Sequence, residues 1–173
     1  SSTLINKGFE MIEAKWLFGV DPSKIEVLVH PQSIVHSMVQ FEDTSVIAQL
    51  GQPDMRTPIQ YAFSYPERLR LDIPPIDFFE LSKLTFERPD GERFPNLGYA
   101  YEAVRVGGNM PCILNAANEV AVELFLQERI GFRQMSQLIE KTIKQASFVA
   151  SPSLDDYVES DAETREIASK FIH

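Results

Sequence analysis

The sequence has only one cysteine, Cys112, and three histidines among its 173 residues. A single cysteine excludes a disulfide within the chain and a cysteine-based zinc site. Because its neighbours Met110 and Ile113 are apolar, we expect a small buried thiol at this position. No metal-binding spacing joins His30 and His36, so we assign no metal site to the two internal histidines.

The sequence also has no excess of basic residues, no long apolar run and no glycine-rich nucleotide motif. The 16 Lys and Arg residues face 25 Asp and Glu residues, and the net charge of −9 argues against a surface for nucleic acid or for an anionic membrane. Without a run of about 18 apolar residues or a charged-then-apolar leader, we expect a soluble, cytosolic protein with no membrane span. The absence of a G-x-G-x-x-G fingerprint excludes a dinucleotide-binding domain within this sequence.

What the sequence does contain is a globular composition, with 44% hydrophobic residues, and an opening stretch of eighteen residues that reads as a helix. Ile5, Phe9 and Trp16 share one face of this helix, and Leu4 and Met11 lie roughly opposite, so we expect it to be largely buried. Its polar residues fall within one arc of about 120° and are Thr3, Asn6, Lys7, Glu10 and Glu13. Because burying charges without partners is unfavourable, something polar should face this arc.

Spacing alone leaves two interpretations of the polar arc open. In the first, the hydroxyl groups of residues 1–3, the helix start and Lys7 with Asn6 bind a phosphate, while Glu10 offers an oxygen ligand to a divalent metal. In the second, the arc is the solvated stripe of a surface helix, and Lys7 and Glu10 form a weak ion pair. Spacing favours the second, although Gly8 in mid-helix indicates the close approach of another backbone or a ligand.

The remaining pattern predicts an α+β fold, in which a small sheet covered by helices is followed by an α-helical bundle. Strands are expected over residues 25–30, 35–41 and 46–50, and a helix over residues 59–65. Helices are then expected over residues 97–106, 111–127, 132–146 and 161–171. Five prolines mark residues 66–96 as a connector, which should be packed because its apolar side chains need burial. The predicted domains are residues 1–65 and 97–173, on either side of this connector.

Three further features allow either a structural or a functional role. Asp54 and Arg56 lie in a loop between a strand and a helix, where they either cap one another or belong to a site. Polar residues at Asn115, Asn118 and Glu119 interrupt an apolar helix, and we expect them to satisfy neighbouring backbone or a facing loop. The acidic run at residues 155–161 is typical of solvated surface.

Four stretches of the sequence, in this order, strongly resemble the 1-deoxy-D-xylulose 5-phosphate reductoisomerase family. They are Leu4-Ile5-Asn6-Lys7-Gly8-Phe9-Glu10 continuing to Phe18, then His30-Pro31-Gln32-Ser33-Ile34-Val35-His36-Ser37, then Gln49-Leu50-Gly51-Gln52-Pro53-Asp54-Met55-Arg56-Thr57-Pro58-Ile59, and finally Asn115-Ala116-Ala117-Asn118-Glu119. The resemblance covers essentially the whole chain, and four motifs in order are far more specific than one. It implies the end of the catalytic domain, the connector and the C-terminal helical domain of a protein more than twice as long.

By this resemblance, particular residues match functional positions of the family. Ser1, Asn6 and Lys7 match substrate-binding positions around the phosphate, and Glu10 matches the third carboxylate of a divalent-metal site that uses Mg²⁺, Mn²⁺ or Co²⁺. Lys7 and Glu10 would be catalytic, and Glu10 would also contact substrate. His36 matches a position close to the substrate, and Pro53 and Met55 match positions close to the nicotinamide of NADPH.

The resemblance also implies a reaction, partners and a location. The reaction is the NADPH-dependent rearrangement and reduction of a phosphorylated ketose, in a homodimer that pairs through the sheet region. The compartment would be the cytoplasm, or a plastid-type compartment in a eukaryote. The NADPH-binding domain and an Asp-Ser-Glu metal cluster of the family have no counterpart in this sequence, so we expect the isolated chain to lack activity.

Two other hypotheses remain beside this one. The isolated chain could act as a non-catalytic dimerisation and scaffolding module. Without the family, the polar arc of the first helix would suit a generic phosphosugar-binding domain, which predicts phosphate affinity that needs no metal.

Overall fold

The computed structural model describes residues 3–171, which form two compact units. The helical unit contains the residues up to 27 and those from 90 onward, and the hairpin unit contains residues 28–89. The helical unit is therefore assembled from both sides of the hairpin unit in the sequence. This division differs from the predicted domains, whose boundaries stay a prediction about the longer protein.

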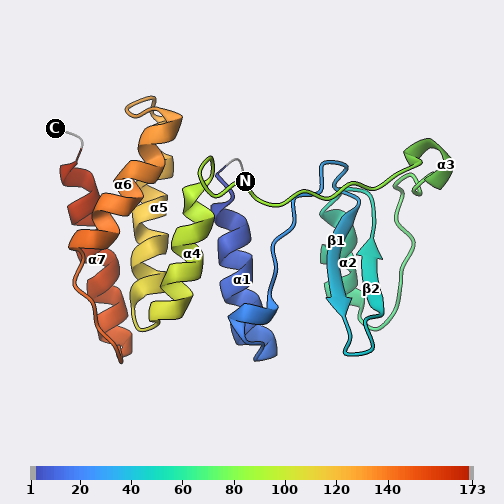
Figure 1. Cartoon of the computed structure of the whole chain (residues 1–173), viewed down its shortest axis with the longest axis horizontal. Helices are drawn as coiled ribbons and strands as arrows, with labels where there is room; N and C mark the ends of the chain where they lie inside the picture. The colour runs from blue at the N-terminus through green and yellow to red at the C-terminus, as the bar shows by residue number, and fades with distance from the viewer. Residues whose placement is uncertain (1–2, 172–173) are drawn as a thin grey trace. The chain divides into compact units, whose positions relative to one another are not determined.

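The helical unit contains the elements between which most of the core lies (Figure 1). They are α1 (Ile5–Phe18), the short 3-10 helix η1 (Pro22–Lys24), α4 (Pro95–Val106), α5 (Met110–Leu126), α6 (Phe132–Gln145) and α7 (Leu154–Lys170). The helix α5 is the centre of the bundle because it packs against α4, α6 and α7. Its fully buried residues include Ile113, Leu114 and Ala117. The predicted α-helical bundle is confirmed.

The helix α1 packs against α4, and the two run in the same direction in Figure 1. A Cβ atom at Gly8 would lie 2.3 Å from Cβ of Ala100, so only glycine allows this approach. The glycine in mid-helix therefore marks the close approach of another helix. The contact fixes which side of α1 faces the core, and it leaves Asn6, Lys7 and Glu10 on the exposed side.

The predicted burial of α1 is right for its first half and wrong for its last turn. Ile5 and Met11 are buried, whereas Trp16, Leu17 and Phe18 expose 74%, 76% and 76% of their surface. Consecutive residues of a helix are about 100° apart, so these three spread over about 200° of its circumference. One neighbouring helix cannot cover such an arc.

The last helix begins seven residues earlier than the sequence pattern predicted, at Leu154 instead of residue 161. Its start is fixed by a capping box, in which the Ser153 hydroxyl accepts from the backbone N–H of Asp156 while the Asp156 carboxylate accepts from Ser153. Asp155 and Asp156 also lie in the first turn, where the helix dipole favours negative charge. The acidic run is mostly exposed, as expected, but it is helical.

The hairpin unit is built on the antiparallel strands β1 (Val35–Gln40) and β2 (Val46–Leu50), followed by α2 (Arg56–Ser64) and the short helix α3 (Phe78–Leu81). Both strands occur where they were predicted, which confirms the α+β class. In Figure 1, α2 lies behind the hairpin. The helix α2 begins three residues before the predicted start because Pro58 fits its first turn, where no hydrogen bond from the backbone nitrogen is needed.

The predicted strand over residues 25–30 is wrong, since the structure has only a single bridge there. The backbone of Val29 exchanges two hydrogen bonds with Glu87, of 3.0 and 2.9 Å. In this antiparallel register the next pairs would be 31 with 85 and 27 with 89. Pro31 and Pro89 occupy two of these positions and lack the N–H that a ladder requires, so the pairing cannot spread.

The predicted packing of the connector is only partly right. Gln32 accepts hydrogen bonds from the backbone and hydroxyl of Thr85, and the ring of His30 stacks on Phe86 with centroids 4.7 Å apart. In contrast, Phe78 and Phe79 expose 61% and 97% of their surface. Within residues 3–171, no helix has both the length and the apolar character to cross a membrane.

Candidate functional site

The exposed side of α1 carries the first group of predicted site residues. The ammonium of Lys7 donates to both carboxylate oxygens of Glu10, at 2.7 and 3.0 Å. About half of each side chain is exposed, 46% for Lys7 and 55% for Glu10. Asn6 and Glu13 are also exposed. In this chain the polar arc thus has the geometry of a solvated stripe, and an exposed pair of this kind contributes little stability.

The start of α1 is open to an anion. Among residues 3–171 no side chain caps it, its first turn has no acidic residue, and Leu4 before it adopts a left-handed conformation with φ of 59°. Uncapped N–H groups and the positive end of the helix dipole favour a negative group, and Lys7 adds a cation one turn on. Thr3 is buried, which was not predicted, and Ser1 lies outside the described residues.

Glu10 alone does not make a metal site. Across residues 3–171, no group of three or more His, Cys, Asp or Glu side chains could hold a metal ion. The Glu10 carboxylate is nevertheless accessible and is a suitable oxygen ligand for a hard divalent cation.

The second group of predicted residues surrounds the loop after β2, in the hairpin unit. The pairing of β1 with β2 is irregular between Val35 and Ser37, which makes His36 the extra residue of a bulge. Its Nε2 atom lies 3.1 Å from the carbonyl oxygen of Gly51, the residue that follows β2. The bulge therefore turns His36 towards the start of the loop that carries Pro53 and Met55.

The loop itself is held by Asp54 and Arg56. The guanidinium of Arg56 donates to both Asp54 oxygens, at 2.6 and 3.0 Å, and the backbone N–H of Arg56 donates to the same carboxylate. These bonds lower the pKa of Asp54 to about 2. Of the two interpretations of this pair, the structure shows mutual capping. It leaves Pro53 exposed and Met55 70% exposed at the start of α2.

The predicted site residues therefore fall into two groups, each in its own compact unit. Asn6, Lys7 and Glu10 share one side of α1 in the helical unit, and His36, Pro53 and Met55 gather around the 51–55 loop in the hairpin unit. The motifs assigned both groups, and the roles of these residues in a site stay a prediction.

Arg165 is a residue that sequence reasoning missed. It donates to Glu119 at 2.6 Å and to Asp161 at 2.7 Å, which joins α5 to α7 and lowers the pKa of Glu119. Asn115 donates to the same Glu119 carboxylate. Asn115 and Glu119 thus have the expected structural role, but they bond to one another and to a side chain of the helix α7, not to backbone or a facing loop. The spacing of Asp161 and Arg165 by four residues was the available signal. The side-chain oxygen of Asn118 is buried without a partner among the described residues.

Cys112 is only partly buried, and its Sγ atom lies 3.5 Å from the carbonyl oxygen of Tyr157. Burial raises the pKa of its thiol, which makes it less reactive. The structural role expected for this residue agrees with these surroundings, although the burial is less complete than predicted.

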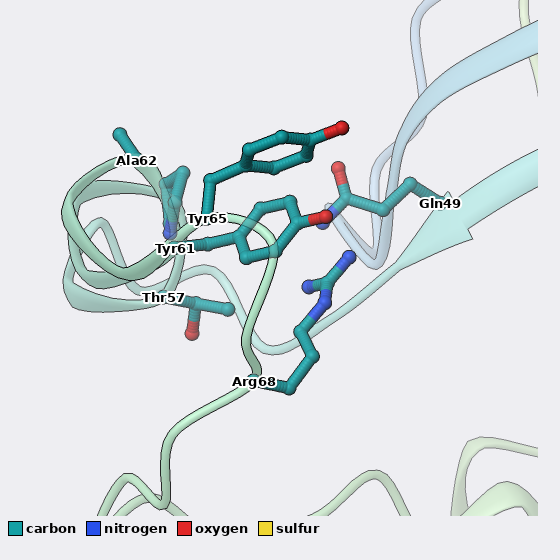
Figure 2. Close-up of a pocket in the computed structure, with 7 residues that line it drawn as sticks. Gln49, Thr57, Tyr61, Ala62, Tyr65 and Arg68 are labelled. Atoms are coloured by element: carbon teal, nitrogen blue, oxygen red, sulfur yellow. The ribbon is translucent and has the colours of Figure 1, made fainter.

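The hairpin unit also has a pocket of about 560 Å³ that contains none of the predicted residues. Figure 2 shows Tyr61 between Tyr65 and Arg68, with Gln49 of β2 at one side. The Arg68 guanidinium lies 3.5 Å from the centre of the Tyr61 ring, in a cation–π contact. The spacing of Tyr61 and Tyr65 by four residues was visible in the sequence, but Arg68 lies beyond the helix, where periodicity gives no signal.

Comparison with known proteins assigns this fold. Residues 50–167 match the family model for the DXP reductoisomerase C-terminal domain. The chain is 63% identical over 172 residues to the 1-deoxy-D-xylulose 5-phosphate reductoisomerase of Bacteroides thetaiotaomicron and 54% identical to that of Desulforamulus reducens. Each match covers 99% of this chain but 44% of the relative, so the chain spans less than half the length of these relatives.

Solved structures give the same result. The chain superimposes with a TM-score of 0.91 and 45% identity on the reductoisomerase of Zymomonas mobilis in complex with NADPH. A second reductoisomerase, in complex with NADPH, fosmidomycin and magnesium, gives a TM-score of 0.90 and 40% identity. These matches cover 99% and 98% of this chain, and 45% and 44% of the solved chains.

A helical bundle with a two-stranded hairpin unit inserted after its first helix is thus the fold of the C-terminal portion of a reductoisomerase. The chain belongs to the 1-deoxy-D-xylulose 5-phosphate reductoisomerase family.

Proposed function

We propose that this chain is the C-terminal part of an enzyme that converts 1-deoxy-D-xylulose 5-phosphate into 2-C-methyl-D-erythritol 4-phosphate in isoprenoid biosynthesis. In this reaction the carbon skeleton of the ketose phosphate rearranges to an aldehyde, which then accepts a hydride from NADPH to become an alcohol. Support comes from family membership and from the exposed Lys7–Glu10 pair at an uncapped helix start. The solved relatives bind NADPH, magnesium and fosmidomycin.

The start of α1 binds the phosphate of the substrate in this proposal. Lys7 supplies positive charge, Asn6 supplies an amide donor, and Ser1 supplies a hydroxyl. The uncapped N–H groups and the helix dipole add to the attraction. A phosphate fixed at one end of the substrate orients its reacting end, and orientation of this kind lowers the barrier without changing the chemistry.

Glu10 contributes one oxygen ligand to a divalent metal, Mg²⁺, Mn²⁺ or Co²⁺, and contacts the substrate through it. The metal, when bound, would polarise the carbonyl and hydroxyl oxygens of the substrate. Binding it requires Glu10 to exchange part of its contact with Lys7, which the exposure of both side chains permits.

In this proposal the 51–55 loop of the hairpin unit lies next to the nicotinamide ring of NADPH. Pro53 and Met55 present exposed apolar surface, which suits one face of a nicotinamide ring. His36 is held against the same loop by its contact with Gly51 and lies close to the substrate in this proposal. The NADPH-binding domain itself would be supplied by the part of the enzyme outside this chain.

We further propose that the enzyme is a homodimer that pairs through the hairpin, in the cytoplasm or in a plastid-type compartment of a eukaryote. The two-stranded sheet has two unpaired edges. Its exposed apolar side chains include Val39, Val46 and Ile47, and Val39 lies directly opposite Ile47 in the register. A second copy can cover this surface by a two-fold contact, in which the same patch serves both subunits.

The role of Glu10 is tested by Glu10→Gln in the full-length enzyme that contains this chain. We expect turnover to fall by about a hundredfold or more, the scale of a lost electrostatic contact in a transition state, while the thermal unfolding temperature stays the same. The matched control is Glu13→Gln, an exposed carboxylate one turn further along α1, which should keep full turnover. Normal turnover in Glu10→Gln would contradict the proposal.

A second function, that of a non-catalytic dimerisation and scaffolding module, is favoured for the isolated chain by the exposed apolar hairpin. Sedimentation of the chain alone should then give a dimer, and an assay of NADPH oxidation with the ketose phosphate should give no signal. Substrate-dependent oxidation by the isolated chain would defeat this second view.

A further inference from the structure

Asn96 is a buried polar side chain without a hydrogen bond. It is 0% exposed, and neither its Oδ1 nor its Nδ2 atom has a partner among residues 3–171. In this part of the chain no other buried side chain leaves two polar atoms unpaired. A side chain that is 0% exposed borders no space of the size of a water molecule, so an ordered water does not satisfy it. An unpaired buried amide is unfavourable, and its presence in a native fold requires a reason.

A second asparagine of the helical unit shows the bonds that a purely structural amide makes. Asn109 is also 0% exposed and immediately precedes α5. Its nitrogen donates to the Ser147 carbonyl at 2.9 Å and to the Ser160 hydroxyl at 2.8 Å, and its oxygen accepts from the N–H of Val149 at 2.9 Å. Asn96 makes no such bonds, so support of the surrounding fold does not account for an amide at its position.

The position of Asn96 in α4 places it beside the start of α1. It is the second residue of α4 and precedes Ala100 by four residues, so the two lie on the same face of the helix. Ala100 is the residue that meets Gly8, and α1 and α4 run in the same direction (Figure 1). One turn before that contact, Asn96 therefore faces Leu4 and the first turn of α1. Helical side chains lean towards the N-terminal end, which directs the amide to the two helix starts.

The start of α1 also has unsatisfied groups of its own. Among the described residues no side chain caps α1 or α4, so free backbone N–H groups and the positive ends of two helix dipoles lie side by side. Leu4 has a φ of 59°, a left-handed conformation that strains any residue with a Cβ atom. An unpaired amide, free N–H groups and a strained residue at one place indicate that this helix start has a second arrangement, in which these groups are satisfied.

We infer that Asn96 is a positioning residue for the phosphate site at the start of α1. When an anion binds the free N–H groups, the first turn of α1 shifts against α4, and the Asn96 amide pairs with backbone groups of that turn. The unpaired amide disfavours the free state, so its pairing favours the bound state. Asn96 acts through the helix start and does not touch the substrate. The inference rests on the proposed function, because it requires a phosphate at this place.

Asn96→Leu in the full-length enzyme tests the inference, because leucine has a similar volume and no polar atoms. Removal of an unpaired buried amide should leave the thermal unfolding temperature of the free enzyme unchanged or raise it. The KM for the ketose phosphate should nevertheless rise by about tenfold, the scale of one lost hydrogen bond, while kcat changes little. Inhibition by inorganic phosphate should weaken by a similar factor.

The matched control is Asn109→Leu, which breaks three hydrogen bonds and should lower the unfolding temperature without changing KM. Two outcomes for Asn96→Leu would overturn the inference. Unchanged KM and unchanged phosphate inhibition in a folded variant would mean that the amide has no part in binding. An unfolding temperature lowered as far as in Asn109→Leu would mean that Asn96 is already paired in the free enzyme.

Lys7→Met separates this inference from the proposed phosphate site. If Lys7→Met leaves phosphate inhibition unchanged, the proposed site and the inference both fail. If Lys7→Met weakens inhibition and Asn96→Leu does not, only the inference fails. A measurement on the wild-type enzyme decides the question even if Asn96→Leu does not fold: the NMR signal of the Asn96 side-chain amide should move downfield when inorganic phosphate is added, as expected for a new hydrogen bond. An unmoved signal would overturn the role of Asn96.

Discussion

The two compact units differ most in how they bury apolar side chains. Among the described residues, the helical unit contains every buried apolar residue except Ile34. The hairpin unit has strands of ordinary β propensity, yet both faces of its sheet remain exposed. A two-stranded hairpin is marginally stable by itself, whereas a bundle with a continuous core can be stable alone. The helical unit is therefore stabilised by its own core, whereas the hairpin unit depends on the surfaces that it contacts.

The difference between the units is tested most directly by truncating a buried isoleucine in the helical unit and an exposed isoleucine in the hairpin unit. Ile139→Ala empties a fully buried position of α6 and should lower the free energy of unfolding by about 3 kcal/mol. Ile47→Ala removes a side chain that is 66% exposed in β2 and should cost less than about 0.5 kcal/mol. Urea unfolding followed by helical circular dichroism measures the loss in the helical unit, and urea unfolding followed by the NMR amide signals of β1 and β2 measures the loss in the hairpin unit. Equal losses would erase the distinction between the units.

The protein concentration affects the result for Ile47→Ala, because self-association through the hairpin would bury Ile47. The comparison holds below the concentration at which the chain associates. A cost for Ile47→Ala that appears only at high concentration would sharpen the comparison, since it would show that the hairpin unit gains stability from a second copy.

A smaller difference in stability is expected between alanine substitutions at two glycines of the helical unit. Gly8→Ala places a Cβ atom 2.3 Å from that of Ala100, so α1 and α4 must move apart, and we expect a loss of about 1–3 kcal/mol. Gly98 lies on the exposed side of α4, where a Cβ atom meets nothing within 4 Å. Gly98→Ala should therefore raise stability by about 0.4–1 kcal/mol through helix propensity. Thermal unfolding of both variants shows whether each substitution lowers or raises stability. A stabilising Gly8→Ala would contradict the close approach of the two helices.

The smallest expected effect is a pH dependence of stability that comes from Asp54 in the hairpin unit. The folded pKa of Asp54 is about 2, below its ordinary value of 3.8, so its contribution to stability is present above the ordinary pKa. This contribution disappears as the pH falls through about 2. An NMR titration of the Asp54 carboxyl should show the low midpoint, and Arg56→Leu should raise it. The control is Asp156, whose lowered pKa comes from Ser153 in the helical unit and should not change in Arg56→Leu. An unchanged Asp54 midpoint would contradict the pairing.

The sequence predicted local structure well where the pattern of side chains decides it. Both hairpin strands and the bundle followed from periodicity and turn signals, whereas the functional residues were assigned only by the resemblance to a known family. The strand over residues 25–30 failed because its partner is 58 positions away, at Glu87, and prolines stop the pairing. The early start of α7 depended on the capping box of Ser153, which an acidic run conceals in the sequence.

Within the candidate site, motifs located Lys7, Glu10 and His36, but their geometry was beyond the sequence. The bulge that turns His36 towards Gly51 depends on the register of two strands. The exposure of Trp16 could not be predicted either, because an apolar residue in a helix is normally assigned to the core.

The single bridge between Val29 and Glu87 also bears on the speed of folding. The helix α1 and its neighbour α4 lie on opposite sides of the hairpin unit in the sequence, so their contact must close a long loop of chain. Closure entropy grows with the logarithm of loop length, and a loop about fourfold shorter saves about 1.2 kcal/mol. Once Val29 and Glu87 have paired, few residues remain between them and the two helices. The Val29–Glu87 bridge thus shortens the loop that the contact between α1 and α4 has to close.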